Sequence, residues 1–223
     1  QPSRQRHHPT ERDGDEQHAE SGVAPRGPAK IGEQLADRPR LFAATKVWTP
    51  GRWLGVQQME SSRRKWGVAR FDLMQIHNLL DWEAHLDTLK AMKADGRLRY
   101  IGITTSHGRR HDEFARVMAR EPLDFVQFTY NLDDRAAEQR LLPLAQERGM
   151  AVIVNRPLDG GGLFRRVRDQ PFFLKFVVPH PAVTCAIPAT SRVEHMRDNM
   201  GAGFGRLPDA EMRARMVRYF EGL

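Results

Sequence analysis

The sequence predicts an α/β fold of the (β/α)8 TIM-barrel type, in which six of the eight strands are recognisable. Six short apolar runs rich in β-forming residues alternate with amphipathic stretches of helical length. Strands and helices in this order give a parallel sheet with helices outside it, through right-handed crossovers. No Gly-x-Gly-x-x-Gly follows the first strand, which argues against the competing doubly wound fold. Polar residues collect after the apolar runs, on the face where barrel active sites form.

The chain divides into two segments of different composition. Residues 1–30 contain one strongly apolar side chain, Val23, among many charged, Gly and Pro residues. Such a segment cannot bury enough surface to offset its ordering entropy, so we expect it to be disordered. The barrel domain is expected to span residues 31–223.

Composition excludes several classes of protein. With 223 residues and 40% hydrophobic content, the chain can form one large α/β domain. No apolar run approaches the ~18–20 residues of a transmembrane helix, and no signal peptide is visible. We therefore expect a cytoplasmic protein, as the sequence is given, without a membrane partner. The single Cys185 excludes an internal disulfide.

The positive charge does not indicate a nucleic-acid partner. The formal net charge is +7, but the basic pairs are scattered along helix-like segments and no zinc-finger, RRM or KH pattern accompanies them. Solvated helix faces explain these pairs better. His107 and His111 stand four residues apart without a carboxylate or cysteine partner, so no metal site is expected.

The strands are expected where apolar runs are continuous, which is typical of strands buried on both faces. In chain order they cover residues 41–48, 71–78, 100–106, 125–131, 151–158 and 183–190.

The first two helices have clear end signals. Within residues 49–67, Thr49 is a plausible N-cap and Pro50 a plausible first helical residue. Residues 81–96 place Trp82, Leu86, Leu89 and Met92 on one stripe, with Gly96 as the stop signal.

Two later helices are marked by their residue types. Residues 133–149 have the same amphipathic design, with Pro143 expected to break or kink the helix. Residues 191–200 begin with Ser191 and Glu194 at capping-box spacing.

The motifs around the strand ends resemble those of the aldo-keto reductases. They are, in order, ATKVW, FDLMQIHN, GRLRYIGITT, FVQFTYN, RPLDGGGL and IPATSRVEHMRDN. Each is weak alone, but the ordered set is specific and runs from about Ile31 to the C-terminus. The resemblance implies a barrel that reduces a small-molecule aldehyde or ketone with NADPH, bound without a Rossmann fold.

The resemblance assigns two catalytic positions. The family's active site holds an aspartate, a tyrosine, a lysine and a histidine, and the tyrosine protonates the carbonyl oxygen as hydride arrives at carbon. Lys46 matches the lysine and His77 the carbonyl-orienting histidine. Taken alone, Lys46 is more typical of a strand end that meets solvent, and His77 of a loop residue that bonds to the backbone. Their joint occurrence after consecutive strands favours the active-site interpretation.

The resemblance also assigns a cofactor site. Gln127 and the Thr104–Thr105 pair match positions that hold the nicotinamide carboxamide, although polar strand ends on a barrel rim explain the threonines equally well. Asn155 stands where an aromatic residue often stacks on the nicotinamide. The cofactor-binding candidates are Thr104, Thr105, Gln127, Asn155, Arg156, Pro157, Leu158, Thr190, Ser191, Arg192, His195 and Asn199.

The last motif leads into a helix N-terminus, whose free N–H groups attract phosphate. Thr190, Ser191 and Arg192 would supply hydroxyls and a cation for an adenosine 2′-phosphate, and His195 and Asn199 match positions at the adenine end. A solvated helix residue is an equal explanation for Arg192 alone. The resemblance implies NADP(H), with NAD(H) less favoured. A lysine and an arginine frequent in this motif are replaced by Ala189 and His195, which weakens the preference for NADP(H) over NAD(H).

The family's remaining two catalytic positions are not matched. Counting back from Gly32 places the tyrosine at Ala24 and the aspartate at Ala19, and the first tyrosine in the chain is Tyr100. The first two barrel strands are also not recognisable, for which an altered or frame-shifted N-terminus is a hypothesis. We therefore expect impaired activity, or alternatively a non-catalytic NADP-binding or regulatory module.

Overall fold

A computed structural model of the protein describes residues 41–167 and 170–223. The expectation of disorder for residues 1–30, and the positions of Ala19 and Ala24, lie outside the described residues. Within them, six parallel strands form one sheet in sequence order. This order confirms the predicted alternation of strands and helices.

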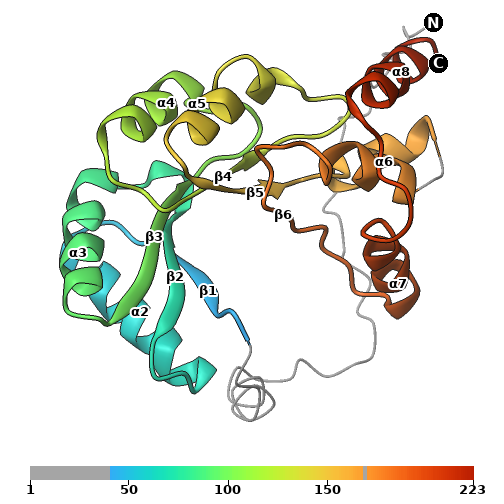
Figure 1. Cartoon of the computed structure of the whole chain (residues 1–223). Helices are drawn as coiled ribbons and strands as arrows, with labels where there is room; N and C mark the ends of the chain where they lie inside the picture. Colours follow the sequence, from blue (N-terminus) through green and yellow to red (C-terminus); the bar gives the residue numbers. More distant parts are fainter. Residues whose placement is uncertain (1–40, 168–169) are drawn as a thin grey trace, which may run out of the picture.

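The sheet curls into an open arc with helices on its outer side (Figure 1). Its strands are β1 (Ala44–Val47), β2 (Phe71–Ile76), β3 (Leu98–Thr104), β4 (Phe125–Thr129), β5 (Ala151–Asn155) and β6 (Cys185–Ala186). The α-helices are α2 (Arg52–Trp66), α3 (Trp82–Ala94), α4 (His111–Arg120), α5 (Leu141–Glu147), α6 (Gln170–Val177), α7 (Val193–Gly201) and α8 (Ala210–Glu221). In the described residues, three 3-10 helices follow β2, β4 and β5, namely η1 (His77–Leu79), η2 (Ala136–Glu138) and η3 (Asp159–Arg165).

Strand alternation separates the apolar outer face of the sheet from a more polar inner face. Val47 lies against the start of α2, where a Cβ on Gly55 would be 3.3 Å from its Cγ2 atom. Met74 lines a cavity with residues of α2 and α3. Lys46 directly precedes Val47, and Gln75 directly follows Met74. Both therefore face the inside of the arc, where they pair in register.

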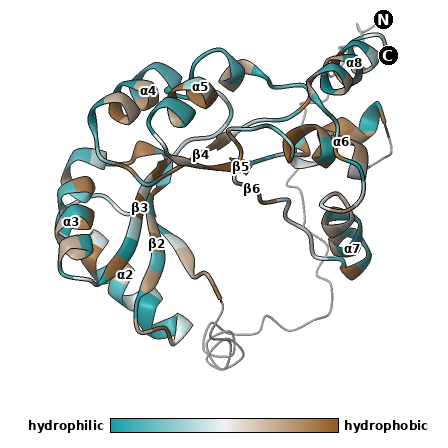
Figure 2. Ribbon diagram, in the orientation of Figure 1, coloured by the Kyte–Doolittle hydropathy of each residue, from teal (hydrophilic) through white to brown (hydrophobic). Residues whose placement is uncertain are grey.

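The four central strands are largely buried, as expected, but the two edge strands are not. Three of the four residues of β1 are partly exposed, and Cys185 of β6 is exposed. Each edge strand has only one neighbour in the described sheet, so one side lacks cover. Figure 2 shows hydrophobic residues concentrated on the strands and hydrophilic residues recurring along the helices.

The first helix begins two residues later than expected. Arg52 opens α2 and Gly51 is its N-cap, so the assignment of Thr49 and Pro50 was wrong. The carboxylate of Asp81 accepts the Gly51 N–H at 2.7 Å, which fixes the turn at Gly51.

The predicted capping box on α7 is also wrong. Arg192 is the N-cap of this helix, and no side chain caps it. The Thr190 hydroxyl instead accepts the Arg192 N–H at 3.1 Å, within the loop.

Pro143 lies close to a break, as expected. The stretch splits into η2 and α5, and Pro143 is the third residue of α5. Because the first-turn N–H groups of a helix have no partner within it, a proline is tolerated there. The C-terminal end of α3 agrees with the sequence, because the helix ends at Ala94 and Gly96 follows two residues later.

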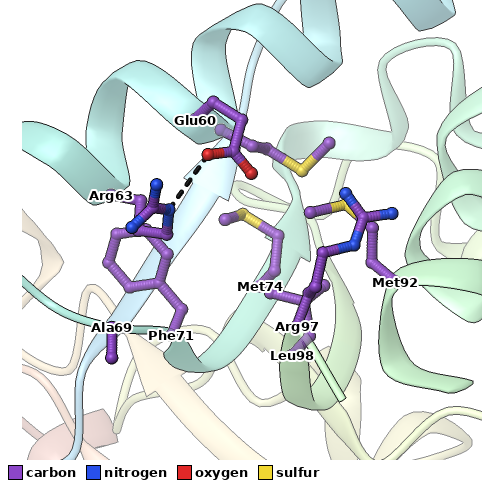
Figure 3. A pocket seen from close by; sticks show the side chains of 9 residues that line it. Glu60, Arg63, Ala69, Phe71, Met74, Met92, Arg97 and Leu98 are labelled. Atoms are coloured by element: carbon purple, nitrogen blue, oxygen red, sulfur yellow. Dashed lines mark hydrogen bonds and ion pairs between the residues drawn. The ribbon is translucent and has the colours of Figure 1, made fainter. Parts of the chain in front are cut away.

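A cavity of about 200 Å³ lies between α2, α3 and the N-terminal ends of β2 and β3 (Figure 3). Met59, Met74 and Met92 line it, and Glu60 accepts a 2.9 Å ion-pair contact from Arg63 beside it. This cavity belongs to the outer layer of the fold and lies at the strand ends opposite the polar residues described next.

Candidate functional site

Lys46 and His77 lie on the inner face near the C-terminal ends of neighbouring strands. Lys46 pairs in register with Gln75, and His77 stands two residues further along, on the same face. The Trp48 ring packs edge-on against the His77 imidazole with centroids 5.0 Å apart. Burial, and then the charge of Lys46, lower the pKa of His77 below its usual value. The electrostatic interaction indicates that the two side chains are close.

Three polar groups of this cluster lack partners among the described residues. Burial lowers the pKa of Lys46, and no described carboxylate pairs with it. His77 Nδ1 and Gln75 Nε2 are buried without a hydrogen bond within residues 41–167 and 170–223. Unsatisfied buried polar atoms are uncommon in proteins and call for an explanation. An amine, an imidazole and an amide together can bind a carbonyl oxygen.

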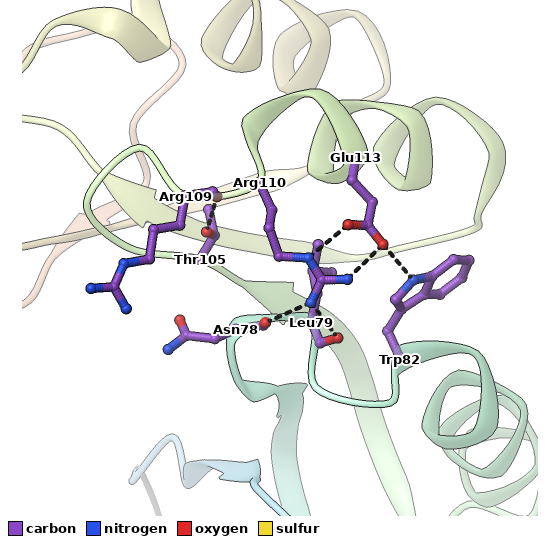
Figure 4. A network of polar contacts seen from close by, with 7 residues as sticks. All are labelled: Asn78, Leu79, Trp82, Thr105, Arg109, Arg110 and Glu113. Carbon is purple, nitrogen blue, oxygen red and sulfur yellow. Dashed lines mark hydrogen bonds and ion pairs between the residues drawn. The ribbon is translucent and has the colours of Figure 1, made fainter. Parts of the chain in front are cut away.

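The loop that carries His77 is held from outside by Arg110 (Figure 4). Asn78 and Leu79 both have positive φ angles, of 52° and 53°. Arg110 donates to their carbonyl oxygens at 3.3 and 3.0 Å and makes two 2.6 Å contacts with Glu113. The Glu113 carboxylate also accepts from the Trp82 indole at 3.2 Å. This network fixes the backbone that follows the candidate catalytic histidine.

None of the three tyrosines in the sequence lies beside Lys46 and His77. Tyr100 stacks with Phe42 near the opposite end of the strands. The buried Tyr130 donates to Glu138, and burial raises its pKa above the usual value. Tyr219 is exposed on α8. The described site therefore contains no phenolic proton donor.

Thr104 and Gln127 are brought together on the inner face. They pair in register across β3 and β4, and both are buried. The Thr104 hydroxyl accepts the Asn78 N–H at 2.9 Å and keeps its own proton to donate. These two side chains could hold a carboxamide.

Thr105 and Asn155 are more fully occupied by other protein groups. The Thr105 hydroxyl donates to the Arg109 carbonyl at 2.6 Å. The Asn155 amide accepts from the Thr129 hydroxyl at 2.8 Å and donates to the Thr105 carbonyl at 2.9 Å. Both therefore tie neighbouring strand ends together, and their contact with a cofactor stays a prediction.

The loops after β5 and β6 enclose a cleft of about 400 Å³. Five of the predicted cofactor residues line it, namely Arg156, Pro157, Leu158, Thr190 and His195. Arg156 has a positive φ of 48° and contacts Asp159 at 2.8 Å, while its Nε atom is buried without a described partner. The cleft thus joins two segments that the sequence had assigned to one ligand.

The N-terminal part of α7 completes this side of the site. Ser191 and Arg192 are exposed, and Arg192 makes a loose 3.7 Å ion pair with Glu194. Asn199 lies one turn after His195 on the same helix face and is buried, yet neither atom of its amide has a described hydrogen-bond partner. A buried, unsatisfied amide fits the edge of a heterocyclic base.

Sequence reasoning missed Gln75, Trp48 and Arg110. Gln75 could have been found from strand alternation, because it stands two residues before His77 in the same run. Trp48 and Arg110 are defined by contacts between segments that no local pattern reveals.

Two further features are absent from the described part of the chain. No helix there is long and apolar enough to cross a membrane. No three His, Cys, Asp or Glu side chains in residues 41–167 and 170–223 gather closely enough to hold a metal ion.

Residues 29–173 of this chain match the sequence model of the Aldo/keto reductase family. An uncharacterized oxidoreductase of Schizosaccharomyces pombe is 27% identical over 162 residues, covering 66% of this chain and 51% of that protein. This chain therefore spans about half the length of that relative. Methylglyoxal reductase YeaE of Escherichia coli is 24% identical over 203 residues, covering 82% of this chain and 71% of that protein.

Solved structures show the same fold. The holo form of aldo-keto reductase AKR11C1 from Bacillus halodurans aligns with a TM-score of 0.74 at 20% identity, covering 87% of this chain and 77% of that one. An aldo/keto reductase from Klebsiella pneumoniae, solved with NADP and acetate, aligns with a TM-score of 0.71 at 21% identity, covering 86% and 75%. The predicted barrel class is thereby confirmed, with six strands in the described residues.

Proposed function

The chain belongs to the aldo/keto reductase family, and we propose that it binds NADP(H) in the β5–β6 cleft and reduces an aldehyde or ketone beside Lys46 and His77. The observation that carries this proposal is the cleft itself, because it gathers cofactor candidates from two loops around one space. The Lys46–His77 cluster lies on the inner face of the same sheet, at the same ends of the strands.

The residues on α7 next to the cleft, and those at the ends of β3 and β4, suit a phosphorylated dinucleotide. Arg192 and the N-terminus of α7 would attract phosphate oxygens, and the exposed guanidinium favours a 2′-phosphate over a free hydroxyl. The unsatisfied Asn199 amide would pair with the adenine edge. Thr104 and Gln127 would hold the carboxamide. We therefore propose NADP(H) as the preferred cofactor, with NAD(H) bound more weakly.

The catalytic groups act on the carbonyl oxygen. NADPH supplies hydride when bound. His77 would donate a hydrogen bond to the oxygen, and the Lys46 ammonium would stabilise the negative charge that develops there. Because no tyrosine stands beside them, His77 or water would deliver the proton. The loss of a positioned acid lowers rates by about 10²–10⁴-fold, so we propose a slow reductase.

A non-catalytic NADP-binding or regulatory module is the alternative function. The absence of a tyrosine from the described site is the observation that favours it, since cofactor binding does not need that group. Turnover separates the two functions.

Turnover can be measured as NADPH consumption with methylglyoxal, chosen because one relative reduces it by name. We expect slow consumption by the wild-type chain and a further loss of at least about 10²-fold in Lys46→Met, because the charge that stabilises the alkoxide is removed. Lys65→Met, an exposed lysine at the end of α2, is the control and should retain the wild-type rate. Equal rates in the wild type and Lys46→Met would contradict the proposal.

A further inference from the structure

The amine of Lys46 stands in surroundings unlike those of the other described lysines. Lys90 and Lys93 form ion pairs of 2.6 and 2.7 Å with carboxylates, and Lys175 donates to two backbone carbonyls. Lys65 is exposed at the end of α2. Lys46 is partly buried on the inner face and has no partner among the described residues. No nearby described carboxylate thus holds it in the ammonium form.

Two further groups beside Lys46 are suited to carbonyl chemistry. His77 presents a buried Nδ1 without a described partner, and Gln75, directly opposite Lys46 on the next strand, presents a buried Nε2 without one. The exposed Trp48 indole packs against His77 and offers an apolar wall to a small organic group. A nucleophile, an acid–base group and a hydrogen-bond donor therefore share one small area.

We propose that Lys46 forms a reversible imine with small aldehydes on the inner face of the sheet, in a reaction that needs no nicotinamide cofactor. This goes beyond the proposed reductase, in which Lys46 acts as a charge and makes no bond to the substrate. It does not depend on the reductase proposal, because the reaction uses only Lys46, His77 and Gln75.

The reaction is balanced without a further reagent. The nitrogen lone pair of the neutral amine attacks the carbonyl carbon, the π electrons move to oxygen, and a proton transferred from nitrogen gives a carbinolamine. His77 then protonates the hydroxyl, which leaves as water as the carbon–nitrogen double bond forms. A proton lost from nitrogen returns to His77. Gln75 donates a hydrogen bond to the oxygen while it carries charge. Amine and aldehyde become imine and water.

Burial favours this chemistry because only the neutral amine is a nucleophile. The pKa of Lys46 is lowered by burial, which raises the neutral fraction at a given pH. Each unit by which a pKa falls raises the neutral fraction of an amine about tenfold, well below that pKa.

The test is reductive trapping without NADPH. The protein is incubated with propanal and sodium cyanoborohydride near neutral pH, and the propylation of each lysine is followed by peptide mass spectrometry. We expect Lys46 to be labelled at least about tenfold faster than the exposed Lys65, because the partly buried Lys46 amine lies beside His77 and Gln75. Equal or slower labelling of Lys46 would overturn the inference.

Two variants separate the imine from general reactivity. His77→Gln should slow the labelling of Lys46 several-fold and leave Lys65 unchanged, whereas equal slowing of both would count against a local acid–base role. Lys46→Arg should abolish the fast label without creating another. Circular dichroism checks that each variant is folded.

The outcome is independent of reductase activity. Fast labelling of Lys46 without NADPH turnover would support the imine and count against the reductase. NADPH turnover together with equal labelling of Lys46 and Lys65 would support the reductase and count against the imine.

Discussion

The sequence predicted that Lys46 and His77 lie together, because each stands near the C-terminal end of a strand and such ends meet at one edge of a parallel sheet. The charge of Lys46 acts on the pKa of His77, which agrees with this placement, and their catalytic roles stay a prediction. Gln75 could have been found only by applying alternation within the run. The unsatisfied state of its amide depends on packing, which the sequence does not display.

Arg110 illustrates what local patterns cannot reveal at the scale of single residues. It appears in the sequence as one of two adjacent arginines, yet only Arg110 bonds to the loop after His77. In Figure 4 the side chain of Arg109 extends away from that network.

Arg110→Ala should therefore destabilise the protein by about 1–3 kcal/mol, because two backbone carbonyls and Glu113 lose a charged donor. Arg109→Ala is the matched control and should change the free energy of unfolding by less than about 0.5 kcal/mol. Urea denaturation of both variants measures the difference. Similar losses in the two variants would contradict the role assigned to Arg110.

At the scale of elements, all six strands were found, while helix starts were less accurate. Apolar runs define strands directly, but the start of α2 depends on Asp81, thirty residues away in the chain. The capping box of α7 failed because the Thr190 hydroxyl, and not Ser191, bonds to the backbone at the helix start. At the starts of α2 and α7, long-range and loop hydrogen bonds thus outweighed the local capping propensity.

The packing of α2 against α3 depends on Gly55. A Cβ added there would lie 2.4 Å from His85 Cε1, and His85 is held by a 2.7 Å bond to the Thr49 carbonyl. Gly55→Ala should destabilise the protein by about 1–3 kcal/mol through overpacking.

Gly201→Ala in α7 is the control for this substitution. A Cβ there has no neighbouring atom within 4 Å, so the change should be neutral or stabilise by up to about 1 kcal/mol through helix propensity. Thermal unfolding compares the two variants. A stable Gly55→Ala variant would show that α2 is not held as described.

At the scale of the whole molecule, the barrel class followed from the order of elements, whereas the exposure of the edge strands did not. Continuous apolar runs predicted buried strands. β1 and β6 are partly exposed instead, because each has only one neighbour in the described sheet. The number of neighbours is a property of the assembled sheet and is not encoded in any one run.

Acid should destabilise the fold through partly buried histidines. Burial lowers the pKa values of His77, His111 and His180 below the usual 6.5. The unfolded chain then binds more protons than the folded one, so stability falls as the pH drops from about 6.5 through the folded pKa values. The urea midpoint should decrease over this range.

His180→Asn should weaken this acid dependence. The asparagine oxygen can replace His180 Nδ1, which accepts the Ala182 N–H at 3.1 Å, and it does not titrate. His107→Asn, in an exposed loop with a positive φ of 55°, is the control. Identical pH dependence in wild type and His180→Asn would contradict the contribution of this histidine.

Cofactor binding is the central claim at this scale, because it unites loops after β5 and β6 with α7. Isothermal titration of the chain with NADPH tests it most directly, since binding does not require turnover. We expect saturable binding of NADPH to the wild-type chain. Arg192→Ala should lower the affinity for NADPH about tenfold, which corresponds to the loss of one charge-assisted hydrogen bond, and should leave the affinity for NADH nearly unchanged. Arg197→Ala, on the exposed face of the same helix, should bind NADPH like the wild type. Absence of NADPH binding to the folded wild-type chain, or equal affinity in wild type and Arg192→Ala, would contradict the assignment of this cleft.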